Sequence, residues 1–328
     1  MQTIPQTPII PSISMYEETI RIHSRTEEGK KSKEVGLSLH GIGQILFHQG
    51  RYLEALEKLE EALVLLAETV GKDDSLVAGV LSIKAACYQR MGHVGEARAM
   101  HEEALRINRV ACGDDSEKVA ASLGNLAGIF YQQGMFADAR SKYEEALRIF
   151  RSLHGDAHPD VAGVFNSIGL ILRAEGHLDK ALEMHGQALK IQRQILGEDH
   201  HDVADSLANS GTIFADLGRH EEAVERFNDA LSIYAITLGA DNRQSARVHS
   251  LMALSKRQTG DVAGAMKSEV EATRIVKLLD KTRQRDRAEE LKSMLHFVLS
   301  LLFAFLCFFL SWWYRCSIPF YPGENCKR

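Results

Sequence analysis

Two short stretches bring histidines and aspartates close enough in sequence to suggest a metal site or an acid–base pair. The first holds His154 and His158, and the second is the run Asp-His-His-Asp at 199–202. Imidazole and carboxylate are common zinc ligands, and a His–Asp pair can move a proton. Both stretches directly precede helical apolar patterns, however, and Asp160 and Asp202 stand where a helix N-cap would be. We therefore predict that these stretches cap helices and bind no metal.

Other chemistry-bearing patterns are absent from the sequence. It contains no nucleophile elbow, no P-loop and no glycine-rich dinucleotide fingerprint, and its five cysteines form no CxxC pair. The formal net charge of -5 provides no basic field that would attract nucleic acid. We predict a protein that is not an enzyme, uses no cofactor and does not bind nucleic acid.

The two histidine stretches occupy the same place in a unit of 42 residues that repeats without a slip of register. Full copies begin at Val35, Val77, Val119, Val161, Val203 and Ser245. In each copy a helical apolar pattern ends at a glycine and a second helical pattern follows. Such a period predicts a stack of helix–turn–helix hairpins.

Small and charged residues at fixed offsets predict how the hairpins pack. Alanines recur in every copy at the places of Ala139 and Ala146, and Ala127 lies on the first helix of the third copy. Two helix backbones are expected to approach closely there. Glu144 and Arg148, four residues apart, predict an exposed ion pair along the second helix.

The third copy carries the landmarks of the tetratricopeptide repeat. They are Leu123, Leu126, Ala127, Phe130, Gly134, Phe136, Ala139, Tyr143 and Ala146. The longer period and the connectors between copies resemble the 42-residue repeats of kinesin light chains and nephrocystin-3. This resemblance covers about 35–276 and implies an all-α fold, a right-handed α-α superhelix of six hairpins. Residues 1–34 lack the heptads of a kinesin light chain, so a motor subunit is not expected.

The resemblance also implies a binding surface, since the concave face of such a superhelix binds partner proteins. The face of each first helix that points away from its packed apolar residues supplies the candidates. They are Gln44, His48, Gln89, Arg90, Asn125, Tyr131, Gln132, Asn166, Arg173, Asn209, Thr212 and Asp216. Their mixed polar, aromatic and cationic groups suit an extended peptide, although an ordinary solvated helix face would look similar.

We therefore predict a scaffold or adaptor that binds a protein or peptide in this groove. The alternative is a structural scaffold that self-associates through its convex face or its N-terminal cap. No lysine occupies the first groove positions of the copies, so docking of acidic chaperone C-termini is not expected.

The ends of the chain complete the predicted organisation. It comprises a disordered tail (1–14), a half-repeat cap with a linker (15–34), the solenoid (35–276), a charged capping helix (277–294), a transmembrane helix (295–314) and a short tail (315–328).

The transmembrane prediction rests on twenty residues, Leu295 to Tyr314, without Asp, Glu, Lys or Arg. A helix of that length spans about 30 Å, the thickness of a bilayer core. More Lys and Arg precede than follow it, which predicts a cytoplasmic solenoid anchored to an intracellular membrane. The alternatives are a buried capping helix and a C-terminus that results from a mistaken gene model.

Overall fold

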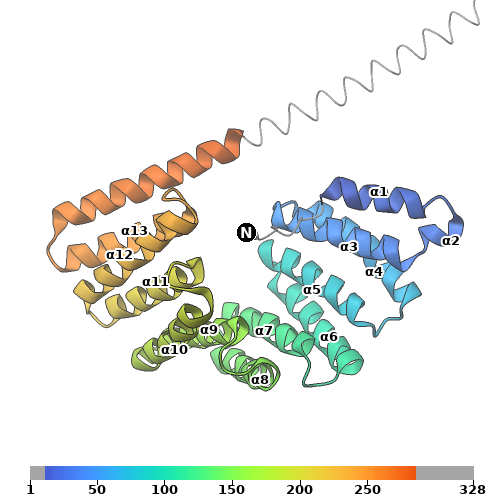
Figure 1. Cartoon of the computed structure of the whole chain (residues 1–328), viewed down its shortest axis with the longest axis horizontal. Helices are drawn as coiled ribbons and strands as arrows, with labels where there is room; N and C mark the ends of the chain where they lie inside the picture. Colours follow the sequence, from blue (N-terminus) through green and yellow to red (C-terminus); the bar gives the residue numbers. More distant parts are fainter. Residues whose placement is uncertain (1–11, 286–328) are drawn as a thin grey trace, which may run out of the picture. The chain divides into compact units, whose positions relative to one another are not determined.

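The computed structural model describes residues 12–285, all of whose regular elements are α-helices (Figure 1). The chain divides at Ile233 into two compact units. The helices are α1 (Ile13–His23), α2 (Glu27–Lys30), α3 (Lys33–His48), α4 (Tyr52–Thr69), α5 (Ser75–Arg90), α6 (Val94–Cys112), α7 (Glu117–Gln132), α8 (Phe136–His154), α9 (Pro159–Ala174), α10 (Leu178–Leu196), α11 (His201–Asp216), α12 (His220–Thr237), α13 (Arg243–Gln258) and a last helix at 262–285.

The helices recur with the predicted period. The first helices of the copies, α3, α5, α7, α9, α11 and α13, each begin 42 residues after the one before. Within the first unit, α3 packs on α4, α5 on α6, α7 on α8 and α9 on α10. Each second helix then packs on the first helix of the next copy. The prediction of an all-α solenoid of helical hairpins is confirmed.

First helices of neighbouring copies also touch each other directly, α3 with α5 and α5 with α7. They therefore form one surface of this unit, with α4, α6 and α8 on the other side (Figure 1). We call the solvent-facing side of α3, α5, α7, α9 and α11 the first-helix surface.

Glycines end the helices as predicted. Gly134 follows α7 with φ 75° and Gly155 follows α8 with φ 80°. Only glycine adopts this left-handed conformation without strain, and it stops the helix. Glycines with positive φ recur in register in the other copies, which gives every hairpin the same turn.

The recurring alanines lie where helices approach. Ala127, Ala139 and Ala146 are all 0% exposed, and Ala139 and Ala146 belong to one apolar core that extends from α6 to α11. The prediction of close helix packing at these positions is confirmed. A larger side chain there has no free volume to occupy.

Replacing Ala146 with leucine is expected to lower the free energy of unfolding by about 1–3 kcal/mol, because the extra carbons must displace packed neighbours. Urea denaturation followed by circular dichroism measures the change. Ala137→Leu on the exposed face of the same helix is the control and should change stability by less than about 0.5 kcal/mol. Equal losses for both variants would contradict the packing.

The last described helix reaches into the predicted capping segment, 277–294. Residues 262–285 form one continuous helix, so the charged segment that begins at 277 continues the second helix of the sixth copy. At the other end α1 packs against α3.

The transmembrane part of the predicted fold is corrected. Within residues 12–285, no helix is both long and apolar enough to cross a bilayer. The physical reason is that these helices are amphipathic, with their apolar sides packed against neighbouring helices and their polar sides exposed. The predicted span, 295–314, lies outside the described residues. The fold is therefore a helical-hairpin solenoid without a membrane helix among its described elements.

Candidate peptide-binding surface

All twelve predicted groove residues lie on α3, α5, α7, α9 or α11 and are exposed or half-buried. Three of them bond to the next copy. Gln89 Nε2 donates to Gln132 Oε1 at 3.0 Å, and Arg173 Nε donates to Asp216 Oδ2 at 2.5 Å. Asn166 Nδ2 donates to Ser206 Oγ at 2.9 Å. These bonds fix side chains of consecutive first helices relative to each other along the surface.

Other predicted residues are engaged within their own copy. The Tyr131 ring lies 5.7 Å from the Phe136 ring, at the turn between α7 and α8. His48 has a similar place at the end of α3, with its ring 5.4 Å from Phe47. Thr212 Oγ1 donates to the Ala208 carbonyl inside α11. These side chains lie on the predicted surface but contact neighbours of their own hairpin.

A hollow of about 390 Å³ lies on the first-helix surface around α5 and α7. We call it the N-terminal notch. It is lined by His40, Gln44, Ser75, Leu76, Gly79, Ser82, Ile83, Asn108, Lys118, Ala121, Ser122 and Asn125. Of the predicted residues it brings together Gln44 and Asn125. Its lining combines polar groups with the apolar side chains Leu76 and Ile83, the composition of a site for a peptide side chain.

Lys118, Asn108 and His40 line the N-terminal notch but were not among the predicted residues. Lys118 Nζ donates to Ser75 Oγ at 2.6 Å. Lys118 could have been found by comparing copies, because Asp160 and Asp202 occupy its position in the next two. Asn108 lies on the second helix α6, whereas all the predicted residues lie on first helices.

The surroundings of His40 disfavour its charged form. Burial lowers the pKa of its imidazole, because the charged form would lose its hydration. Its Nε2 atom is buried and has no hydrogen-bond partner within the described residues. One unpaired imidazole nitrogen therefore lies buried beside the notch.

A second, smaller hollow of about 170 Å³ lies between α9 and α11. We call it the C-terminal notch. It is lined by Pro159, Gly163, Asn166, Gln192, Leu196, Asp202 and Asp205. Only Asn166 of the predicted residues lines it. Two of its lining side chains, Asp202 and Asp205, are carboxylates.

A buried polar network joins the wall of the C-terminal notch to the core. His185 is 0% exposed, and its Nδ1 lies 2.8 Å from Asn166 Oδ1. Ser206 Oγ donates to Gln192 Oε1 at 2.6 Å. Burial, with a smaller effect of the nearby Arg173 charge, lowers the pKa of His185 to about 4. The neutral ring holds the Asn166 amide in place.

The histidine stretches cap helices, but with different atoms than predicted. His158 Nδ1 accepts the Asp160 N–H at 3.3 Å, and His200 Nδ1 accepts the Asp202 N–H at 3.2 Å. The N-caps are therefore the histidines, and the prediction that Asp160 and Asp202 are the caps is wrong. The aspartates lie in the first helical turn, where a carboxylate favours the helix dipole. His154, His158 and Asp160 approach within 4.8 Å of one another, as do 200–202, but capping already uses one imidazole nitrogen.

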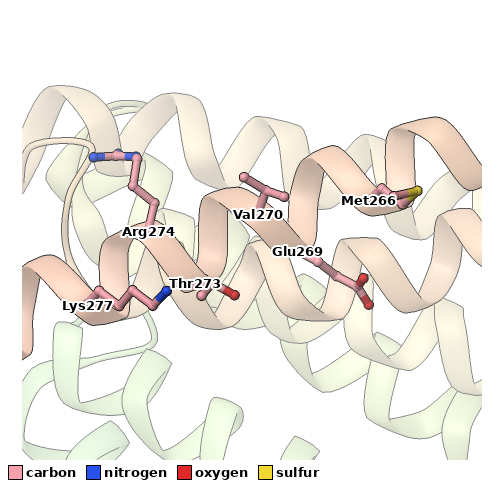
Figure 2. Close-up of a pocket in the computed structure, with 6 residues that line it drawn as sticks. All are labelled: Met266, Glu269, Val270, Thr273, Arg274 and Lys277. Carbon is pink, nitrogen blue, oxygen red and sulfur yellow. The ribbon is translucent and has the colours of Figure 1, made fainter.

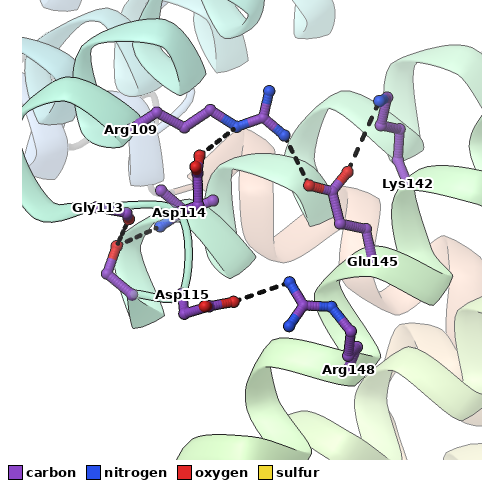
Figure 3. A network of polar contacts seen from close by, with 9 residues as sticks. Arg109, Gly113, Asp114, Asp115, Lys142, Glu145 and Arg148 are labelled. Atoms are coloured by element: carbon purple, nitrogen blue, oxygen red, sulfur yellow. Dashed lines mark hydrogen bonds and ion pairs between the residues drawn. The ribbon is translucent and has the colours of Figure 1, made fainter.

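Several ion pairs of the second helices join side chains of neighbouring copies. Arg148 pairs with Asp115 at 2.8 Å, and not with Glu144 as the spacing predicted (Figure 3). Arg109 reaches Glu145 of the next copy at 2.6 Å. Each exposed pair contributes little energy alone. Together they fix the connector between α6 and α7 against α8.

The second unit has its own open hollow, of about 510 Å³, on the last described helix (Figure 2). Met266 and Val270 form its apolar side and are 60% and 67% exposed. Arg274 and Lys277 lie toward the other end of the same helix (Figure 2). None of the predicted groove residues lies in this hollow.

Comparison with known proteins identifies relatives of this fold. Residues 35–75, 76–152 and 160–236 match family models described as tetratricopeptide repeat. Among solved structures, BtubC (BKLC) from P. vanneervenii is 28% identical with a TM-score of 0.59, over 70% of this chain and 91% of that one. A putative kinesin light chain from Podosopora anserina is 22% identical with a TM-score of 0.51, over 60% and 92%.

A signal transduction ATPase with a tetratricopeptide repeat sensor from Pyrococcus horikoshii has a TM-score of 0.61 at 18% identity, over 81% of this chain and 38% of that one. The likeness to this ATPase and to the Podosopora protein shows the fold alone. The comparison with curated proteins found no match.

Proposed function

Because this chain belongs to the tetratricopeptide-repeat family, whose domains are protein-interaction scaffolds, we propose that it is a non-enzymatic adaptor that binds an extended peptide segment of a partner on the first-helix surface. The N-terminal notch is the observation that carries this proposal. It is a hollow of about 390 Å³ that combines apolar side chains with hydrogen-bonding groups from three copies. Kinesin-light-chain-like solenoids of the 42-residue type are the subgroup that the period supports.

The bonds between copies support a preformed surface. Gln89 with Gln132 and Arg173 with Asp216 hold polar groups in place before a ligand arrives. A surface that is already ordered loses less conformational entropy on binding. An extended peptide can then exchange water for hydrogen bonds at successive copies.

Selection of peptides tests this function. We expect a phage-displayed random dodecapeptide library, panned on the full chain, to yield peptides that bind in fluorescence anisotropy. Combined Gln44→Ala, Asn125→Ala and Arg173→Ala should weaken that binding at least about ten-fold, the effect of losing about 1.4 kcal/mol. The matched control is Glu57→Ala, Glu144→Ala and Lys190→Ala, on exposed positions of second helices. Equal affinity of both triple variants would reject the first-helix surface as the site.

Self-association is the second candidate function, and the exposed apolar side chains of the last described helix favour it. Val262, Met266 and Val270 follow one another every four residues and are 60–67% exposed. Light scattering of the full chain at micromolar concentration is the measurement. The chain should then be a dimer, and the double variant Met266→Glu with Val270→Glu should be a monomer. That result would support self-association through this face. A monomer before and after the change would reject it.

A further inference from the structure

The two notches of the first-helix surface are lined by equivalent positions of the repeat, two copies apart. Gly79, Asn108 and Lys118 line the N-terminal notch, and the residues 84 positions later, Gly163, Gln192 and Asp202, line the C-terminal notch. Both notches lie beside a buried polar pair between copies, Asn108 with Ser122 and Gln192 with Ser206. The corresponding residues at the junction between them are apolar, Phe150 and Val164.

The two notches carry opposite charge at equivalent positions. Lys118 stands in the first, where the second has Asp202, and Ala121 stands where the second has Asp205. Lys118 lies in the first turn of α7, where a positive charge opposes the helix dipole. Helix stability therefore does not explain the lysine. Its Nζ donates to Ser75 Oγ of α5, and its positive charge lies at the notch, where it would attract a negatively charged group.

A buried acceptor without a partner lies beside the N-terminal notch. Asn108 is only 6% exposed, and its Oδ1 has no hydrogen-bond partner within the described residues. The Gln192 Oε1 atom at the equivalent position accepts from Ser206. A buried acceptor without a partner is unfavourable, so a ligand N–H that reaches it would add affinity. A carboxylate side chain with a nearby peptide N–H would satisfy both Lys118 and Asn108.

The repeat geometry sets the distance between the two notches. Packed helices lie about 8–10 Å apart, and the notches are separated by two steps between first helices, which gives about 20 Å. An extended chain advances about 3.3 Å per residue, so about six residues bridge that distance.

We propose that the partner segment, bound as the proposed function requires, is bipolar. It places an acidic residue in the N-terminal notch beside Lys118 and Asn108. A basic residue about six positions away occupies the C-terminal notch between Asp202 and Asp205. The opposite charges fix the direction in which the segment lies along α5 to α11, because the reversed direction would bring like charges together.

Charge exchange tests the proposal on the full chain with the dodecapeptide library. Lys118→Asp introduces the residue of the next two copies, and Asp205→Ala introduces the residue of the third, so both variants suit the fold. Peptides selected on the unmodified chain should share an acidic and a basic residue about six apart. Lys118→Asp should weaken their binding about ten-fold, and replacing the acidic residue of the peptide with lysine should restore it. Asp205→Ala should weaken the binding only of peptides that carry the basic residue.

Three other results are informative. Peptides that bind in a Gln44- and Asn125-dependent way but share no charge pair would overturn the bipolar segment and leave the proposed function standing. Loss of affinity on Lys118→Asp without rescue by the charge-reversed peptide would also overturn it. If no peptide is selected, the proposed function fails, and the bipolar segment fails with it. Circular dichroism melting of both variants checks that they are folded.

Discussion

Lowering the pH from 7 to 4 is expected to destabilise this protein strongly, because two buried histidines must stay neutral in the folded state. His101 is 3% exposed and His185 is 0% exposed, and burial lowers the pKa of each to about 4. In the unfolded chain their pKa returns to about 6.5. Stability is therefore complete above pH 6.5 and is lost as the pH falls toward 4, since the unfolded state then binds more protons. The expected loss is about 3 kcal/mol for each histidine.

Urea denaturation at pH 7 and at pH 4.5 measures this loss. His101→Leu is the informative variant, because Leu59 occupies the same position in the first copy and the His101 Nδ1 atom has no partner among the described residues. The variant should be folded and should lose the part of the pH dependence that His101 contributes, about 3 kcal/mol between neutral pH and pH 4. An unchanged loss of stability between the two pH values would show that His101 does not contribute.

The second large effect is expected at Phe227, which is 0% exposed on α12. Its ring fills the space above Gly211 of α11, where an added Cβ would lie 2.8 Å from the Phe227 Cε1 atom. Phe227→Ala should lower the free energy of unfolding by about 3–5 kcal/mol through lost burial and the cavity left behind. Thermal melting and urea denaturation both report it. Leu53→Ala, at a side chain that is 67% exposed, is the control and should change stability by less than about 0.5 kcal/mol.

The pairing of Phe227 with Gly211 makes this prediction more specific. Gly211→Ala alone should destabilise by overpacking, at about 1–3 kcal/mol. In the Phe227→Ala background the added methyl group enters the cavity, so the double variant should lose less stability than the sum of the two single losses. Strict additivity would contradict the contact.

The solenoid itself was predictable, because every copy repeats the same local signals. Glycines such as Gly134 and Gly155 end helices through their own conformation, and Ala139 and Ala146 recur wherever two helices meet. The residues that surround each of these glycines and alanines also recur every 42 residues. The period therefore predicted helix boundaries and the packed face of each helix.

Contacts that differ from copy to copy were not predictable in this way. Arg148 binds Asp115 of the connector and not Glu144 four residues before it, because the stack brings the connector within reach. His158 became the N-cap since its ring reached the Asp160 N–H. The Arg148 pair depends on a distance between copies, which one helix does not contain, and the His158 cap depends on the local conformation of the connector.

The residues of the candidate site were also predictable only in part. Helical periodicity placed Gln44 and Asn125 on the surface that holds the N-terminal notch. It did not identify Asn108, which reaches that notch from a second helix. It also did not identify Lys118, since its importance follows from contrast with other copies. The prediction of a membrane helix came from composition alone, and the described helices, 12–285, include none that could span a bilayer.

Hydrogen–deuterium exchange of the full chain, with and without a library-selected dodecapeptide, tests peptide binding on the first-helix surface most directly. Exchange reports local opening along the chain, so each helix is observed separately. We predict slower exchange on α5, α7, α9 and α11 when the peptide is present, with α6, α8 and α10 changed least. Slower exchange confined to the second helices or to residues 262–285 would contradict the account.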